Sequence, residues 1–297
     1  MSQNSLSQKN LSQENKSFSN LALSAELQKN LQSLGYESMT PIQAQALPHV
    51  LSGNDLIGQA KTGSGKTAAF GLGLLSNLDI EAYQIQALVL CPTRELADQV
   101  AKHLRTLART MPNIKVLTLC GGVPMGPQIG SLQSGAHIVV GTPGRIEDHL
   151  RRGRLNLKQV NTLVLDEADR MLEMGFQDTL EKIVEQIPKQ RQTLLFSATY
   201  PPEIQSIARR IMNKPELVKV ESTHDDLSIQ QHFYQIETKE ERFDGVRVLL
   251  LEHRPKSALV FCNTKREAQE LADRLKQVGF SVAALHGDLD QRDEIKP

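Results

Sequence analysis

The chain has 297 residues, with 34 Lys and Arg against 34 Asp and Glu, so its formal net charge is zero. This balance excludes a polybasic protein that binds nucleic acid by charge alone. Hydrophobic residues make up 39% of the chain and charged residues 23%, which is typical of a soluble globular protein with a sizeable core. Aromatic residues make up only 4% and Trp is absent, which disfavours a sandwich or barrel with an aromatic core.

The N-terminal segment is strongly polar, because residues 1–20 contain thirteen Ser, Gln or Asn and no apolar stretch. We therefore expect no secretory signal and a disordered polar tail over residues 1–17. No later segment approaches the roughly 18 uninterrupted apolar residues of a membrane span. These observations predict a soluble, cytoplasmic protein without a membrane partner. Cys91, Cys120 and Cys262 adjoin apolar runs without metal-ligand spacing, and we expect small core residues of a reducing compartment.

From residue 18 to residue 220, short apolar runs alternate with segments long enough for helices, such as 94–110 and 177–186. The runs lack period-two alternation, as expected of parallel strands that are buried on both faces. This pattern predicts a doubly wound parallel α/β domain, in which ligands bind beyond the carboxyl ends of the strands. The six runs are 56–57, 87–91, 115–119, 137–140, 162–165 and 193–196.

A polar, acidic stretch without apolar periodicity predicts a linker over residues 221–229. The pattern then restarts, with apolar runs at 231–237, 257–262 and 282–286 and a helical segment at 265–278. Residues 230–297 number only about half of what a parallel α/β domain usually needs. We therefore expect a truncated second domain, unstable because its half-built sheet leaves an edge unpaired.

The segment Ala60-Lys61-Thr62-Gly63-Ser64-Gly65-Lys66-Thr67 follows a predicted strand and precedes a helical pattern. Its glycines allow backbone N–H groups to turn toward phosphate oxygens at the positive end of a helix. In the phosphate-loop pattern, Lys66 neutralises the terminal phosphates and the Thr67 hydroxyl holds Mg²⁺. Ala60 stands where the strict pattern has Gly, and a small residue still fits. The alternative is a Gly-rich turn that merely leads into a helix.

The segment Asp166-Glu167-Ala168-Asp169 follows another apolar run, so its acids emerge at a strand's carboxyl end. A nucleotide enzyme needs a metal-anchoring Asp and a carboxylate that orients water at such a place. Asp166 then acts through Mg²⁺ and Glu167 polarises the attacking water. The alternative is an acidic helix N-terminus, which is favourable by itself.

With these two elements the chain resembles a DEAD-box RNA helicase, over roughly residues 18–293. The segment 35–43 is similar to the family's Q-motif, with Met39 in place of the more usual Pro and Phe18 as the upstream aromatic. This resemblance implies ATP as the nucleotide. The amide of Gln43 can offer adenine a donor and an acceptor at once, and Tyr36 can stack on the base. The alternative for Gln43 is an ordinary position near a helix N-terminus.

Further segments resemble the family's RNA-backbone motifs and the motif that links nucleotide state to strand separation. Such RNA contacts read phosphates and 2′-hydroxyl groups rather than sequence, which suits a neutral chain. Ser197 and Thr199 could instead cap a helix, and Arg151, Arg152 and Arg154 match no motif, which favours a solvated surface. The implied RNA-binding residues are Pro92, Thr93, Arg94, Gly121, Gly122, Thr142, Pro143, Gly144 and Arg145, and the implied coupling residues are Asp169, Ser197 and Thr199.

The resemblance implies two RecA-like domains of the P-loop NTPase class, of which the second continues here through the motifs at 260–264 and 286–293. Stretches 60–75, 87–100 and 163–171 are similar to the bacterial DbpA-type subgroup, which implies ribosomal RNA as the partner. The family's Ala-Arg-Gly-x-Asp and His-Arg-x-Gly-Arg-x-x-Arg motifs do not occur in the sequence.

Two functions remain open: a piece of an ATP-dependent RNA helicase, or a nucleotide- and RNA-binding module without efficient ATPase or unwinding activity. A DNA translocase with the same phosphate loop is disfavoured by the Gln43 motif and the complete Asp-Glu-Ala-Asp segment, so no DNA partner is expected.

Overall fold

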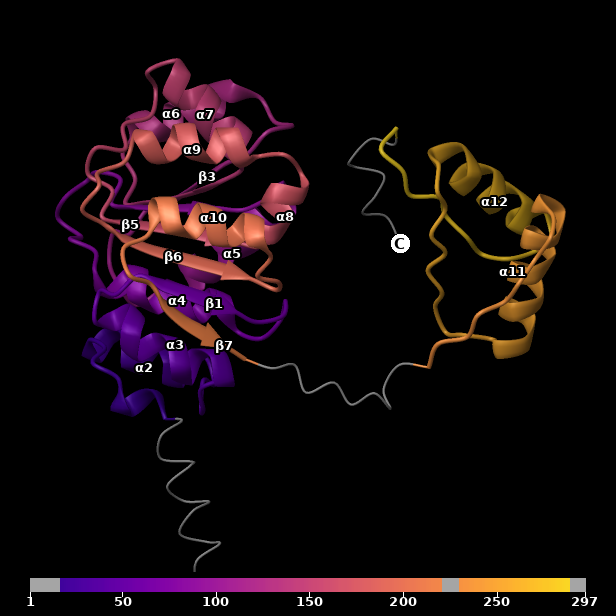
Figure 1. The fold of residues 1–297 in the computed structure, drawn as a ribbon, viewed down its shortest axis with the longest axis horizontal. Coiled ribbons are helices and arrows are strands. Elements are labelled where there is room, and N and C mark those ends of the chain that lie inside the picture. Colours follow the sequence, from indigo (N-terminus) through magenta and orange to yellow (C-terminus); the bar gives the residue numbers. More distant parts are fainter. Residues whose placement is uncertain (1–16, 221–229, 289–297) are drawn as a thin grey trace, which may run out of the picture. The chain divides into compact units, whose positions relative to one another are not determined.

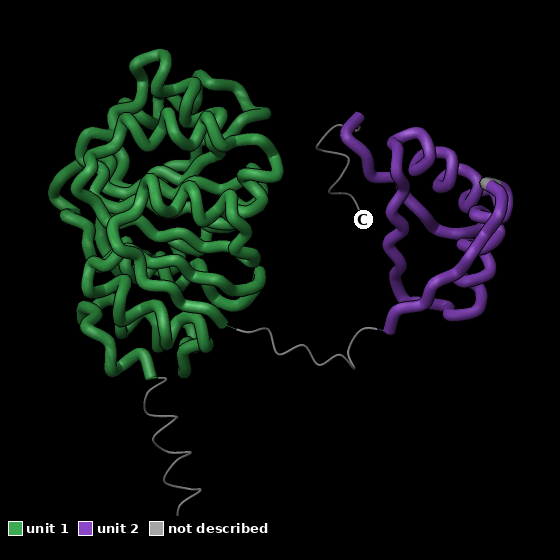
Figure 2. Tube along the Cα trace, viewed as in Figure 1, with its two compact units in different colours: residues 1–223 green, residues 224–297 purple. Residues whose placement is uncertain are grey.

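The computed structural model describes residues 17–220 and 230–288 (Figure 1). The chain divides into two compact units, residues 1–223 and residues 224–297 (Figure 2). The predicted polar tail, apart from Ser17, and the predicted linker at 221–229 lie outside the described residues.

Unit 1 is built on a seven-stranded sheet in the order β3-β4-β2-β5-β6-β1-β7. Every neighbouring pair is parallel, so the predicted doubly wound parallel sheet is confirmed. All six predicted runs form strands, and a seventh, β7, adds an edge beside β1 that the sequence analysis missed. The strands are β1 (Leu56–Gln59), β2 (Ala87–Leu90), β3 (Val116–Leu119), β4 (Ile138–Gly141), β5 (Thr162–Asp166), β6 (Gln192–Ser197) and β7 (Glu216–Lys219).

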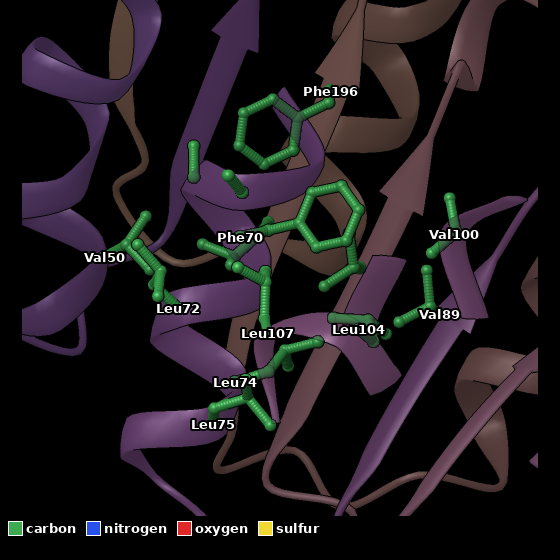
Figure 3. Close-up of a cluster of buried hydrophobic side chains, with 14 of the residues drawn as sticks. Val50, Phe70, Leu72, Leu74, Leu75, Val89, Val100, Leu104, Leu107 and Phe196 are labelled. Atoms are coloured by element: carbon green, nitrogen blue, oxygen red, sulfur yellow. The ribbon is translucent and has the colours of Figure 1, made fainter. Parts of the chain in front are cut away.

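Successive strand residues point to opposite faces of the sheet, and the apolar side chains on both faces are covered by helices. Val89 and Phe196 belong to a core that includes side chains of α2, α3, α4 and α5, and Figure 3 shows Phe70 close to Phe196 within it. Leu88 and Leu195 belong to a second core with α7, α8, α9 and α10. The helices of unit 1 are η1 (Phe18–Asn20), α2 (Ala25–Ser33), α3 (Pro41–Leu51), α4 (Lys66–Ser76), α5 (Arg94–Leu107), α6 (Met125–Gln133), α7 (Pro143–Arg151), α8 (Ala168–Glu173), α9 (Gln177–Glu185) and α10 (Pro202–Ile211).

Helix α5 illustrates how local sequence positions these elements. Thr93 is its N-cap, and the hydroxyl oxygen accepts a hydrogen bond from the backbone N–H of Leu96. Glu95 lies in the first turn and Arg105 in the last, which suits the helix dipole. A stripe of buried side chains at helical spacing then packs α5 against the sheet. The stripe consists of Ala97, Val100, Ala101, Leu104 and Leu107.

Unit 2 contains α11 (Lys239–His253) and α12 (Lys265–Gln277), and no strand forms within residues 230–288. The predicted helix at 265–278 is confirmed, but the predicted strands at 231–237, 257–262 and 282–286 are wrong for the described residues. A buried parallel strand needs neighbours on both edges and both faces. Here Leu259 is 73% exposed and Phe261 is 87% exposed, so the run has no such neighbours.

The three cysteines differ in their surroundings. Cys91 and Cys120 are buried, as predicted, whereas Cys262 is only partly buried, so the expectation of a core residue is wrong there. Burial raises the pKa of the Cys91 thiol and raises that of Cys120 to about 11. Among residues 17–220 and 230–288, no helix is long and apolar enough to cross a membrane.

Candidate functional site

The predicted site residues gather at the edge of the sheet where its parallel strands end. The predicted phosphate loop follows β1, the acidic segment begins at the end of β5, and the predicted coupling residues Ser197 and Thr199 lie at and after the end of β6; these strands are neighbours in the order β5-β6-β1. The predicted RNA residues follow β2, β3 and β4, which are neighbours in the order β3-β4-β2. The sheet therefore brings both groups to the carboxyl ends of its strands, where they occupy adjacent halves of the sheet.

The phosphate loop connects β1 to α4, which begins at Lys66. Gly65 stands at the N-cap with a φ of 97°, which is in the left-handed region that favours glycine. The Lys66 side chain is buried and its Nζ donates to the carbonyl oxygen of Ala60 at 2.9 Å. The ammonium group thus lies at the base of the loop, and Thr67 follows it in the first turn of α4.

Two carboxylates lie at the end of β5: Asp166 is its last residue and Glu167 follows it. Asp166 is buried, and burial raises its pKa to about 6 although the positive charge of Lys66 lowers it. Glu167 adopts a left-handed conformation with a φ of 53° at the N-cap of α8. Its Oε1 accepts a hydrogen bond from the Thr62 hydroxyl at 3.0 Å. This bond ties the phosphate loop to the acidic segment, and the sequence analysis did not predict it.

Asp169 connects the end of β5 to the end of β6. Its Oδ2 accepts hydrogen bonds from the backbone N–H and the hydroxyl of Thr199, both at 2.9 Å. Its own backbone N–H donates to the Ser197 hydroxyl at 3.3 Å. Burial acts to raise the pKa of Asp169, but these bonds outweigh it and lower the pKa. Ser197 therefore accepts a hydrogen bond from the first turn of α8, whose N-cap is Glu167, and it is not the N-cap of α10, which is Pro201.

A cavity of about 350 Å³ lies beside the phosphate loop and is lined by residues that include Tyr36, Thr40 and Gln43. Gln43 is buried; its Oε1 accepts from the Thr40 backbone N–H at 2.9 Å, and its Nε2 donates to the Gly65 carbonyl at 3.1 Å. The alternative interpretation of Gln43 is therefore observed, because it caps the start of α3 in a capping box with Thr40, while its role toward adenine stays a prediction.

Tyr36 is held from two sides at this cavity. Its hydroxyl lies 2.8 Å from Nε2 of His103, on α5. Phe18 is 4% exposed and packs edge-on against the Tyr36 ring, with centroids 5.7 Å apart. Phe18 does not line the cavity, so in this structure it supports Tyr36 from behind. Sequence reasoning missed His103, because 67 residues separate it from Tyr36.

The RNA-side residues share one feature, which is that hydrogen bonds within the protein fix many of their polar groups. Arg94 forms an ion pair with Asp98, with Nε and Oδ2 3.7 Å apart. The Gly121 backbone N–H donates to the Thr142 hydroxyl at 3.4 Å. Pro143 is the first residue of α7, and Gly144 next to it is exposed. Gly122 follows Gly121 in the β3–α6 connection, and Pro92 precedes the α5 cap.

Arg145 points back into the protein. Its Nη1 donates to Gln128 Oε1 at 3.1 Å and its Nη2 donates to the Val123 carbonyl at 3.0 Å. His149 Nε2 lies 2.9 Å from the same Gln128 oxygen. Neither Gln128 nor His149 belongs to a motif that the sequence analysis recognised, and no linear signal distinguishes Gln128 from the other polar residues of α6, Ser131 and Gln133.

The Arg151, Arg152 and Arg154 cluster fits the solvated-surface interpretation. Arg151 and Arg152 both pair with Asp148, at 3.0 and 2.7 Å. Arg154 contacts the sulfur of Met125. All three arginines are exposed. No group of three or more His, Cys, Asp or Glu that could hold a metal ion occurs within the part of the chain that the structure describes.

Comparison with known proteins gives the family. The DEAD/DEAH box helicase family matches residues 40–207, and the helicase conserved C-terminal domain matches residues 239–296. ATP-dependent RNA helicase DbpA of Escherichia coli is 55% identical over 89% of this chain and 58% of the relative. DEAD-box ATP-dependent RNA helicase CshA of Bacillus subtilis is 46% identical over 92% of this chain and 55% of the relative. The chain thus spans less than two thirds of the length of these relatives.

Two solved structures support the fold. A DEAD box protein from the hyperthermophile Methanococcus jannaschii has a TM-score of 0.66 and 41% identity, over 94% of this chain and 75% of that one. Dbp5 of S. cerevisiae bound to RNA and ADP BeF3 has a TM-score of 0.80 and 31% identity, over 94% of this chain and 71% of that one. These likenesses confirm the predicted RecA-like architecture, with a partial second domain. The chain belongs to the DEAD/DEAH box helicase family.

Proposed function

We propose that this chain forms the ATP-binding and part of the RNA-binding surface of an ATP-dependent RNA helicase. The observation that carries the proposal is the arrangement along one sheet edge, where nucleotide motifs occupy β5, β6 and β1 and RNA motifs occupy β3, β4 and β2. Asp169 and Thr199 are joined by two hydrogen bonds at this edge. The domain boundaries at 18–220 and 230–297 belong to the same proposal.

At the phosphate end, we assign charge neutralisation to Lys66 and the positioning of water to Glu167. Lys66 Nζ is already turned into the loop by its bond to the Ala60 carbonyl, and phosphate oxygens would compete for it. Glu167 is held by Thr62, a residue of the same loop, so its carboxylate would lie near phosphates bound by that loop. In-line attack on a terminal phosphate requires a water molecule that is positioned by a fixed carboxylate.

Residues for Mg²⁺ are also present in this half of the edge. Thr67 and Asp166 offer hydroxyl and carboxylate oxygens, which this cation prefers, through water. Asp166 is buried with its pKa raised to about 6, so a nearby cation would favour the charged form of a carboxyl that burial disfavours. When bound, Mg²⁺ neutralises charge on the phosphates. These residues therefore fit the cation that the family's chemistry uses.

For the base, Tyr36 and Gln43 line the cavity beside the loop. We assign stacking to Tyr36 and adenine recognition to the Gln43 amide, whose bond to the Gly65 carbonyl links base recognition to the phosphate loop. Phe18 supports the Tyr36 ring by edge-on packing.

We assign RNA contact to the backbone N–H groups of Gly121, Gly122 and Gly144 and to the side chains of Thr93 and Arg94. Such groups grip phosphates and sugars without reading bases. The similarity to an ATP-dependent RNA helicase supports RNA as the partner, and we extend the proposal to ribosomal RNA and ribosome assembly in the cytoplasm.

A second candidate function concerns the 297 residues by themselves. The sequence contains no His-Arg-x-Gly-Arg-x-x-Arg motif, which in the family supplies arginine fingers, and such fingers contribute about 10³–10⁵ in rate. We therefore expect the isolated chain to bind nucleotide and RNA but to show almost no RNA-stimulated hydrolysis.

The test is a titration of the purified chain with a fluorescent ADP analogue and Mg²⁺, followed by ATPase and RNA-unwinding assays. We expect binding by the wild type and by Lys158→Ala, a control at an exposed lysine, but severe weakening in Lys66→Ala. Absence of nucleotide binding in the wild type would refute both candidates. Robust unwinding of a short RNA duplex by this chain would refute the second candidate alone.

A further inference from the structure

Helix α6 has an unusual buried residue. Of its nine residues, Met125–Gln133, the single buried one is Gln128. Its side chain is polar and only 7% of the residue is exposed. An apolar residue is the usual occupant of such a position, and a buried amide is tolerated only when its polar atoms find partners.

Gln128 has partners on both sides of its amide. The Nε2 group donates to the carbonyl oxygen of Cys120 at 2.9 Å. The Oε1 atom lies 3.1 Å from Nη1 of Arg145 and 2.9 Å from Nε2 of His149. Arg145 in turn donates from Nη2 to the Val123 carbonyl at 3.0 Å. The backbone from Cys120 to Val123 is therefore fastened at both ends, once by Gln128 and once by Arg145.

The fastened segment is Gly121-Gly122, which follows Cys120 at the end of β3. These glycines have no side chains that could pack and hold the loop in one shape. Hydrogen bonds must set the direction of their N–H groups. The Gly121 backbone N–H also donates to the Thr142 hydroxyl, but at 3.4 Å this bond is long and restrains the pair only weakly.

We propose that Gln128 is a positioning residue for RNA. It does not touch the RNA strand but fixes the Gly121-Gly122 backbone in a shape ready to receive phosphates, with Arg145 as its partner. A loop ordered before binding spares the free energy of ordering it during binding. This inference rests on the proposed function, and it reassigns Arg145 from RNA contact to loop support.

The competing explanation is that Gln128 only stabilises the fold, and a second buried glutamine provides the matched control. Gln192 is also 7% exposed and its Nε2 donates to two backbone carbonyls, of Val50 and Asn54, both at 2.8 Å. It is the first residue of β6, so it lies at the opposite edge of the sheet from the site. Replacing either Gln by Met removes buried hydrogen bonds at nearly constant volume.

The experiment compares Gln128→Met with Gln192→Met in the full chain. RNA affinity is measured by fluorescence anisotropy with a short labelled oligouridine, and nucleotide affinity with a fluorescent ADP analogue. Because the Gly121-Gly122 backbone would have to be ordered during binding, we expect Gln128→Met to bind RNA about tenfold more weakly, which corresponds to about 1.4 kcal/mol. Its nucleotide affinity should match the wild type, and Gln192→Met should keep its RNA affinity despite lower stability.

Equal RNA affinities for a folded Gln128→Met and the wild type would overturn the inference, as would an equal loss in both variants. A second measurement serves if the wild type itself binds no RNA, which would count against the proposed function. Amide hydrogen exchange at Gly121 and Gly122 should then accelerate about tenfold in Gln128→Met. Unchanged exchange there would refute the positioning role independently of RNA binding.

Discussion

Two glycines of the phosphate loop allow a matched test of how Gln43 acts. Gly63 has a φ of 79° and Gly65 a φ of 97°, so an alanine at either position adopts a strained backbone at a cost of about 1–2 kcal/mol. A Cβ at Gly63 would meet no atom within 4 Å. A Cβ at Gly65 would lie 2.5 Å from Gln43 Nε2 and 2.9 Å from Thr40 Oγ1. Gln43 must then move and lose its bond to the Gly65 carbonyl, which adds about 1 kcal/mol.

We therefore expect Gly65→Ala to lower the free energy of unfolding by about 2–3 kcal/mol and Gly63→Ala by about 1–2 kcal/mol. Urea unfolding followed by circular dichroism measures both. Because the closest contact is with Gln43, combining Gly65→Ala with Gln43→Ala should reduce the excess, leaving only the contact with Thr40 Oγ1, which makes the two changes non-additive. Equal losses for the two glycine variants, or strict additivity in the double variant, would refute this account of the contact.

Two further predictions concern titratable groups. Burial raises the pKa of Asp166 to about 6 in the folded chain. The stability that the neutral carboxyl provides is therefore fully present below the pKa of Asp in the unfolded chain and is lost as the pH rises through about 6. Asp166→Asn should therefore be more stable than the wild type by about 3 kcal/mol at pH 8, and the two should be nearly equal in stability at pH 4. Thermal unfolding without nucleotide measures both. A difference in stability that does not change with pH would contradict this prediction. Among the cysteines, Cys262 should react promptly with Ellman's reagent in the native chain, whereas buried Cys91 and Cys120 should react only on unfolding; rapid reaction of all three would show that the burial is wrong.

Periodicity located the buried centre of the sheet but not its edge. The six predicted strands are apolar enough to be recognised because both of their faces are covered. Strand β7 was missed because its residues Glu216 and Lys219 are exposed and only Val218 is buried, so its pattern resembles a loop. In unit 2 the opposite error occurred, since apolar runs predicted strands that lack the neighbours a strand needs.

For the site, motif spacing located the residues whose partners are close in sequence or whose chemistry is distinctive. It could not identify contacts between distant segments, such as Thr62 with Glu167 or Tyr36 with His103. Gln128 was missed for a similar reason. Its importance comes from burial and from three partners on other elements, and none of these is visible in a linear pattern.

The strand order has a consequence for how the two halves of the site can communicate. β2, which leads to Thr93 and Arg94, is directly bonded to β5, which ends at Asp166. Neighbouring strands lie about 4.8 Å apart, and a continuous ladder does not stretch or slide. The distance between the end of β2, at the RNA half, and the end of β5, at the nucleotide half, is therefore fixed by the sheet. Any adjustment to a ligand within unit 1 falls to the loops and side chains beyond the strands, so mutations there should alter coupling while mutations inside the ladder alter stability.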